Sequence, residues 1–277
     1  QGTDMYRGSA WRAWDQSKLF ADVLEPRCFA VGSNYKCVGD WPAAARRERV
    51  VEHVAKFLRR RPASTRWVLS LSGGVDSMAL SASLALLQAR VLTVHMDYRR
   101  RTESCREADF VSHWSQAHGW SCIVQPLGGP SWAALPKEEW ERKARQKRYA
   151  LYRHGAEQRD ESKTVEIVPS VVLVGHQAND VAENVAFNLF RGRSIVDLAV
   201  MKHEADVDGV VIGRPLLELR KEELLDFAQR YGLPYLKDTT PAGCDRGVWR
   251  SRVWPAIEAH SDEHVQTFVE TARALFL

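Results

Sequence analysis

The sequence predicts an α/β protein with a parallel, doubly wound sheet, helices on both faces of the sheet, and a helical segment at the C-terminal end. Two observations lead to this fold. Short β-prone runs alternate with stretches of helical length, which is typical of strands joined by crossover helices. The β-prone runs are also apolar along most of their length, as expected for parallel strands that are buried on both faces.

The expected elements follow in chain order. Strands are expected over residues 67–71, 91–95, 121–124 and 171–174, and a further strand over 210–212. Helices are expected over residues 43–61, 76–87, 103–118, 136–159, 179–190 and 221–231. Pro62 and Gly119 mark two helix ends, because proline cannot continue a helix and glycine favours the residue that follows the last turn. The sequence from Arg246 to Leu277 reads as helical with an interruption near Ser261.

Three parts are expected along the chain. Residues 1–48 show weak periodicity and several loop signals, which predicts an extension that packs on the main domain. Residues 49–245 are expected to form the α/β domain, and residues 246–277 the C-terminal helical segment. A chain of 277 residues is long enough for one sizeable core with such appendages.

Composition narrows the possible classes. The chain is 45% hydrophobic and 27% charged, which is typical of a folded protein rather than a disordered one. No apolar run approaches the roughly 18–20 residues of a membrane span, so no membrane partner is expected. The net charge of +4 is too small to indicate nucleic-acid binding, which must be argued from local clusters. The five cysteines form no C-x-x-C pair, which predicts reduced thiols rather than a metal site.

The segment Ser72–Ser77 (S-G-G-V-D-S) joins a predicted strand to a predicted helix. The adjacent Gly73 and Gly74 permit close backbone approach, and the amides here, including that of Val75, meet at the positive end of a helix. Such a concavity favours phosphate, and Ser72 and Ser77 add hydroxyl donors. Asp76 would repel phosphate, so we expect it to hold Mg²⁺. The alternative is a Gly-Gly turn with incidental serines.

The S-G-G-V-D-S string after an apolar strand resembles the PP-loop motif of N-type ATP pyrophosphatases, and it matches neither a Walker loop nor a dinucleotide fingerprint. This resemblance implies that ATP, with Mg²⁺, is split between its α and β phosphates. Further segments are similar to the tRNA(Ile)-lysidine synthetases and their eukaryotic relatives, over about residues 67–255. They are Val94–Tyr98, Ala144–Tyr149, Gly175–Asn184, Arg214–Leu217, Tyr231–Pro234 and Lys237–Pro241.

Two positions depart from that family's H-H-x-D-D pattern. Gln177 stands where the family has its second histidine, and Asn179 where it has its first aspartate. An amide in place of an acid removes a charge, which would weaken binding of a metal or an amine. A sister branch that thiolates tRNA cytidine usually carries C-x-x-C pairs for an iron–sulfur cluster, and this chain has none.

The resemblance implies a ligase that adenylates a wobble cytidine of tRNA and attaches lysine. Asp180 and Glu183 lie three residues apart on a predicted helix and share one face, which suits an ammonium group; the alternative is a solvated face. Arg191 and Arg220 are expected to stabilise phosphate or to form ion pairs. His95, Asp97 and His176 end strands, where ligands bind in open α/β sheets, although structural roles are equally open.

Basic residues mark candidate RNA contacts. Arg145, Arg148 and Tyr149 lie on a basic helix with interleaved tyrosines, which can follow phosphates and stack bases. Arg99 and Arg100 lie on a loop expected at the mouth of the site. Solvated helix faces and a solubilising cluster are the alternatives. Arg246, Arg250 and Arg252 have near-helical spacing that is also compatible with RNA.

A second functional hypothesis follows from the two departures. A catalytically reduced protein of this family would act as an RNA-binding or structural subunit of a ribonucleoprotein, such as an organellar ribosome or its assembly intermediate. The wording of Lys237–Pro241 and the long N-terminal extension favour a eukaryotic relative, so the mitochondrial matrix is the expected compartment, with the cytoplasm as the alternative.

Overall fold

A six-stranded sheet forms the centre of the computed structural model, which describes residues 20, 22–25, 38–99, 103–128, 132, 135–158, 169–194, 201–237 and 245–274. The strands lie in the order β3-β2-β1-β4-β6-β5. Their bounds are β1 Arg66–Ser70, β2 Val91–Asp97, β3 Ser121–Pro126, β4 Ser170–Leu173, β5 Glu204–Val207 and β6 Val210–Gly213. Neighbouring strands are parallel except for β5, which pairs antiparallel with β6. The predicted fold class is confirmed.

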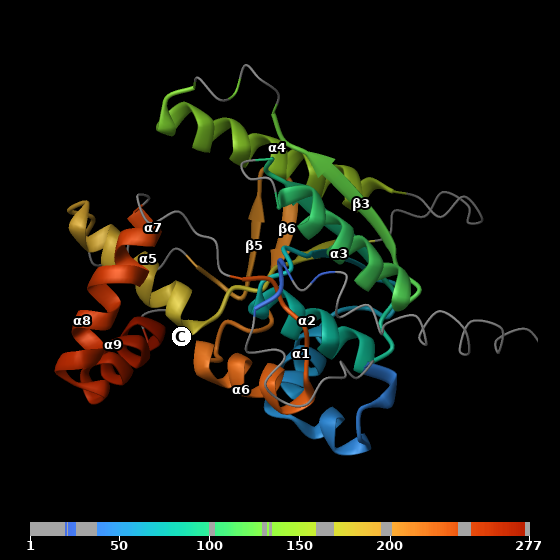
Figure 1. Cartoon of the computed structure of the whole chain (residues 1–277), viewed down its shortest axis with the longest axis horizontal. Coiled ribbons are helices and arrows are strands. Elements are labelled where there is room, and N and C mark those ends of the chain that lie inside the picture. Colours follow the sequence, from blue (N-terminus) through green and yellow to red (C-terminus); the bar gives the residue numbers. More distant parts are fainter. Residues whose placement is uncertain are drawn as a thin grey trace, which may run out of the picture.

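Helices cover both faces of the sheet (Figure 1). The helices on one face are α1 Arg49–Leu58, α2 Val75–Leu86, α3 Ser104–Ala117 and α6 Lys221–Tyr231. The long helix α4 (Lys137–Glu157) covers the other face. Alternate residues of each central strand supply the two cores: Leu69 and Leu173 pack toward the first group, and Val68 and Val172 toward α4, all fully buried. This double burial explains why the strands read as continuous apolar runs.

The C-terminal helices gather on helix α5 (Ala178–Phe190), at one side of the sheet (Figure 1). They are α7 Asp245–Val248, the π-helical turn η7 Trp249–Val253, α8 Trp254–His260 and α9 Asp262–Ala274. The chain breaks at Ser261, as predicted. Val269 and Ala272 of α9 are buried against Val181 and Val185 of α5. Helix α5 is therefore fixed from outside the sheet, which matters because it carries two of the predicted site residues.

The hairpin β5–β6 differs from the prediction, which placed a strand over residues 210–212 alone. Asp208 and Gly209 connect the two strands with φ values of 55° and 78°. Two residues with positive φ form the hairpin turn that Asp-Gly favours. The signal was present, but Glu204–Val207 lacks the apolar character of the buried strands, because it lies at the edge of the sheet.

The described parts of the N-terminal region pack on the α/β core. Leu24 is fully buried and forms a bridge with Leu236, and Phe20 packs edge-on against Phe110 of α3 at 5.7 Å. The predicted helix over 43–61 begins as a 3₁₀ turn, η4 (Ala43–Arg47), and continues as α1 after a break at Glu48, while Val38–Asp40 forms the short η3. Within the described ranges, none of the helices is both long and apolar enough to cross a membrane.

Strand β1 lies at the point where the chain changes direction across the sheet. The chain proceeds from β1 to β2 on one side, whereas β4 pairs with the other side of β1. In open α/β sheets the crevice beside such a switch point, at the carboxyl ends of the strands, is the usual ligand site. The fold thus directs attention to the end of β1, which leads directly into Ser72–Ser77.

Candidate functional site

A cleft of about 350 Å³ opens at the carboxyl ends of β1, β2, β4 and β6. Its lining includes Ser72 and Asp76 after β1, and His95 and Asp97 at the end of β2. A second cleft of about 380 Å³ lies beside it, and Ser72, Gly74, Asp76 and Glu107 line both. The Ser72–Ser77 loop therefore stands between two adjoining cavities.

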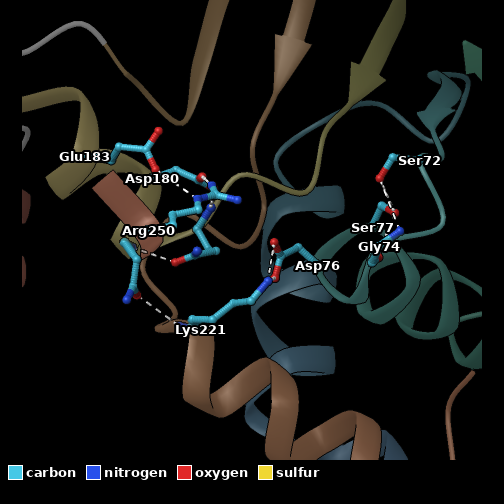
Figure 2. A network of polar contacts seen from close by, with 10 residues as sticks. Ser72, Gly74, Asp76, Ser77, Asp180, Glu183, Lys221 and Arg250 are labelled. Carbon is cyan, nitrogen blue, oxygen red and sulfur yellow. Dashed lines mark hydrogen bonds and ion pairs between the residues drawn. The ribbon is translucent and has the colours of Figure 1, made fainter. Parts of the chain in front are cut away.

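The Ser72–Ser77 loop is held in shape by its own serines. Gly73 has a φ of 85°, in the region that favours glycine, and Gly74 is the N-cap of α2. The Ser72 and Ser77 hydroxyls lie 3.0 Å apart (Figure 2). The Gly73 backbone amide donates to Ser77 Oγ at 3.1 Å. The loop thus places two hydroxyls and the N-terminus of a helix at one point, as a phosphate site requires.

The carboxylate of Asp76 is bound by Lys221, from the first turn of α6. Lys221 Nζ lies 2.8 Å from Asp76 Oδ1 and 2.9 Å from Oδ2 (Figure 2). Burial raises the pKa of Asp76 above its usual value, and the neighbouring ammonium opposes that rise. Asp76 is thus a carboxylate that needs a cation beside it, and here the protein supplies one.

Helix α5 begins with a cap formed by Gln177 and Asp180. Gln177 Oε1 accepts the Asn179 amide at 2.6 Å, and the Gln177 amide donates to Asp180 Oδ2 at 3.0 Å. Asn179 Oδ1 accepts the backbone amide of Lys221 at 3.1 Å. Gln177 and Asn179 therefore have structural roles: Gln177 caps α5, and the side chain of Asn179 links the start of α5 to the start of α6.

The predicted acidic pair of α5 faces one arginine of the C-terminal segment. Arg250 donates from NH2 to Asp180 Oδ1 and from Nε to Glu183 Oε2, both at 3.1 Å (Figure 2). The side chains of Asp180 and Glu183 are 7% and 3% exposed, whereas that of Arg250 is 38% exposed. The two carboxylates do share one helix face, as predicted, and they bind a cationic group. Asp180 also lines the first cleft.

The walls of the first cleft are formed by polar side chains on β2 and α4. His95 Nδ1 donates to the Leu71 carbonyl at 2.8 Å, and burial lowers the pKa of His95, so its Nε2 is an acceptor. Asp97 Oδ1 accepts the Arg99 amide at 2.9 Å. Arg148 donates to the Tyr98 hydroxyl at 2.8 Å, and Arg148, Tyr98 and Tyr149 all line the cleft.

A metal ion fits this site only with help from a ligand. Among the described residues, no group of three or more His, Cys, Asp or Glu side chains is arranged to hold a metal. Mg²⁺ in nucleotide sites is usually held by one or two carboxylates together with phosphate oxygens and water. Asp76 beside the loop matches that arrangement.

These features correspond to a known protein family, because the PP-loop domain matches residues 46–257, more than half of the chain. The chain belongs to the PP-loop family. Curated relatives include the tRNA(Ile)-lysidine synthase of Thermosynechococcus vestitus, which is 29% identical over 77% of this chain and 60% of its own length. The enzyme of that name from a Bradyrhizobium species is 35% identical over 62% of this chain and 46% of its own length. The chain thus spans about half the length of these relatives.

A solved structure shares the fold. The U34-tRNA thiolase NcsA from Methanococcus maripaludis, solved with its [4Fe-4S] cluster, superposes with a TM-score of 0.59 at 17% identity. The match covers 82% of this chain and 78% of that chain. At this identity the similarity supports the architecture.

The first cleft brings most of the predicted site residues together. The residues that line it are Ser72, Gly74, Asp76, Ser77, His95, Asp97, Arg148, Tyr149, His176 and Asp180. Gly73 and Val75 belong to the loop itself, and Glu183 meets Asp180 through Arg250. His176 Nδ1 accepts from Arg214 Nε at 3.3 Å. The roles of these residues in binding and catalysis stay predictions.

Four other predicted residues are not among those that line the first cleft: Arg99, Arg145, Arg191 and Arg220. Arg191 follows the last turn of α5, at the far end from Asp180. Arg145 is exposed on α4 and covers the Tyr149 ring at 4.7 Å. The side chain of Arg99 is 56% exposed, and Arg100 lies outside the described residues. Arg220 is the N-cap of α6.

Sequence reasoning missed the three basic residues that complete the site: Lys221, Arg214 and the inward orientation of Arg250. The spacing of Arg246, Arg250 and Arg252 is compatible with RNA, whereas in the structure Arg250 donates to Asp180 and Glu183 of α5. One signal was available for Lys221 and Arg214, because both follow a predicted strand or begin a predicted helix, where ligands meet helix ends. Their partners lie 145 and 38 residues away along the chain, which periodicity does not reveal.

Proposed function

We propose that this protein is an ATP-dependent tRNA-modifying ligase, and that it adenylates a tRNA cytidine and joins lysine to it. One observation carries the proposal: the phosphate-type loop and the acidic residue Asp180 open into the same cleft at the switch point of the sheet. The curated relatives named tRNA(Ile)-lysidine synthase support the substrate assignment.

The loop would bind the phosphate end of ATP. The Ser72 and Ser77 hydroxyls, which now bond each other, would turn to donate to phosphate oxygens, and the N-terminus of α2 would add its positive field. Asp76 would hold Mg²⁺, which supplies charge neutralisation as pyrophosphate departs. The neutral His95 and the buried Asp97, at the end of β2, suit contacts to the nucleoside.

Two balanced steps account for the chemistry. The ring carbonyl oxygen of the cytidine attacks the α-phosphorus, and the bond to the pyrophosphate oxygen breaks. A lysine amine then attacks the ring carbon that carries this oxygen, and AMP leaves with the oxygen. The amine must lose a proton to a base, and the carboxylates of Asp180 and Glu183 are the candidates.

An RNA strand would approach over α4 and the β2–α3 connection. Exposed Arg145 with Tyr149, and exposed Arg99, lie on this side of the cleft. Arginine planes and tyrosine rings are the groups on which unpaired bases stack. The cytidine of an anticodon loop is such a base.

The test is transfer of labelled lysine to tRNA by the purified protein, with and without ATP. We expect acid-precipitable label that requires ATP and is lost in Asp180→Asn. The matched variant Asp226→Asn, at an exposed position of α6, should keep it. ATP binding without any transfer, in the presence of each tRNA tried, would favour the RNA-binding subunit instead. The ribonucleoprotein partner and the mitochondrial location stay predictions.

A further inference from the structure

The strongest unexplained feature of the site is the ion pair between Asp76 and Lys221. The ammonium is within 3 Å of both carboxylate oxygens, so it lies between them and not at the side of one. The two residues are 145 positions apart and come from two different helices, α2 and α6. The side chains of Lys221 and Asp76 are 32% and 24% exposed, so solvent screens this pair only in part.

Hydrogen bonds at the start of α6 hold the backbone of Lys221. Its backbone amide donates to Asn179 Oδ1, and the Ala178 amide donates to the Leu219 carbonyl at 2.8 Å, which ties the start of α6 to the start of α5. The N-cap Arg220 is itself held, since its amide donates to Glu223 Oε2 at 2.8 Å. The backbone of Lys221 is therefore held in place, while the rotatable bonds of its side chain allow the ammonium to move.

The ammonium competes with a metal for the same atoms. Mg²⁺ at Asp76 would need a carboxylate oxygen at about 2.1 Å, and two cations at such a distance from one carboxylate repel each other. The second cleft offers an alternative position, because Lys221 lines it and its volume of about 380 Å³ leaves room for the displaced side chain. Figure 2 shows the stem of Lys221 reaching Asp76 from the side of α6, beside Arg250.

We propose that Lys221 is a positioning residue that serves as the built-in counter-ion of Asp76, and that it withdraws into the second cleft when Mg²⁺ and nucleotide bind. Its presence holds the carboxylate of Asp76 in place before the metal arrives. The same contact makes metal binding weaker, since the ammonium must first be displaced. This inference rests on the proposed nucleotide site.

The test is a titration with Mg²⁺ in which calorimetry measures ATP binding in the absence of tRNA. It compares the wild type with Lys221→Met. The Mg²⁺ concentration at half-saturation is expected to fall about ten-fold in Lys221→Met, because the competing cation is gone. Lys221→Arg keeps a cation and should stay near the wild-type value. Lys56→Met, which removes an exposed lysine from α1, is the matched control and should change nothing.

Thermal unfolding with Mg²⁺ alone gives a second readout that does not need ATP. Removal of the ammonium should lower the melting temperature of the empty protein, and added Mg²⁺ should restore more of it in Lys221→Met than in the wild type. An unchanged or higher half-saturating Mg²⁺ concentration overturns the inference. If Lys221→Met does not fold, Lys221→Gln, which keeps a hydrogen-bond donor without the charge, is titrated in its place with the same expectation. A wild type that binds no ATP would instead overturn the proposed function.

Discussion

Gly175, at the end of β4, lies against the backbone of Asp76 in the first turn of α2. A β-carbon on Gly175 would lie 2.9 Å from Asp76 C and Ser77 N. Backbone atoms at such a distance cannot move aside as a flexible side chain can. The close approach joins the loop after β1 to the loop after β4, so that the phosphate-type loop and the acidic start of α5 form one site.

Replacement of Gly175 by alanine should disturb that junction. We expect Gly175→Ala to lose about 1–3 kcal/mol of unfolding free energy and to weaken ATP binding, because the added methyl group displaces the start of α2. Urea unfolding and ATP calorimetry measure the two effects. Gly39→Ala is the control, since nothing lies within 4 Å of its added carbon. Equal behaviour of the two variants would show that the contact is not tight.

The cap formed by Gln177 should contribute measurably to stability. Gln177→Ala removes the acceptor of the Asn179 amide, so we expect a loss of about 1 kcal/mol in urea unfolding. Gln116→Ala, at an exposed position of α3, should change stability by less than about 0.5 kcal/mol. If Gln177→Ala is as stable as the wild type, the glutamine has no capping role, and its place in the family pattern needs another explanation.

Arg250 should stabilise the fold because it neutralises two buried carboxylates. Arg250→Ala leaves Asp180 and Glu183 without that partner, and we expect a loss of about 2 kcal/mol at pH 7, allowing for the partial exposure of the arginine. Denaturant unfolding at pH 7 measures this.

Arg252→Ala is the control for Arg250, because it removes an exposed arginine two residues further along. It should lose less than about 0.5 kcal/mol in the same measurement. A loss that is equal for the two arginines would contradict a stabilising ion pair between Arg250 and the two carboxylates.

His118, which lies outside the site, should make the free energy of unfolding depend on pH. It packs between Trp114 and Trp120, and burial lowers its pKa from 6.5 to about 4, although its bond to the Trp114 carbonyl opposes the shift. The neutral ring is favoured in the fold, so the stabilisation is complete above pH 6.5 and is lost as the pH falls toward 4. The loss can reach about 3 kcal/mol.

The measurement is urea unfolding between pH 7 and pH 4.5 for the wild type and for His118→Phe. The variant should lose much of the pH dependence in this interval, whereas His154→Gln, an exposed histidine of α4, should keep it. A pH dependence that is the same in all three proteins would place its origin elsewhere.

Local patterns predicted the frame of this protein better than they predicted its site. The apolar runs of β1 and β4 and the S-G-G-V-D-S loop can be recognised because each signal lies within a few neighbouring residues. The edge strand β5 was missed since Glu204–Val207 is polar, although Asp208-Gly209 carried a hairpin signal.

Local patterns could not predict the ion pairs that complete the site. Asp76 meets Lys221, and Asp180 meets Arg250, only because the sheet and the C-terminal helices bring distant segments together. A spacing rule on one helix can show that Asp180 and Glu183 share a face, but it cannot show which cation that face meets. The same limit hid the structural use of Asn179, whose partner Lys221 lies 42 residues further along the chain. The cap formed by Gln177 is local, because its partners are Asn179 and Asp180.

The most direct measurement of the central claim follows the fate of ATP labelled at the α-phosphate, incubated with the protein, tRNA and lysine. We expect the label to appear as AMP, with release of pyrophosphate, only when tRNA is present, and Ser77→Ala to reduce the rate at least ten-fold. Release of labelled ADP, or AMP formation that is equal in the wild type and Ser77→Ala, would contradict the claim that this loop activates ATP for tRNA modification.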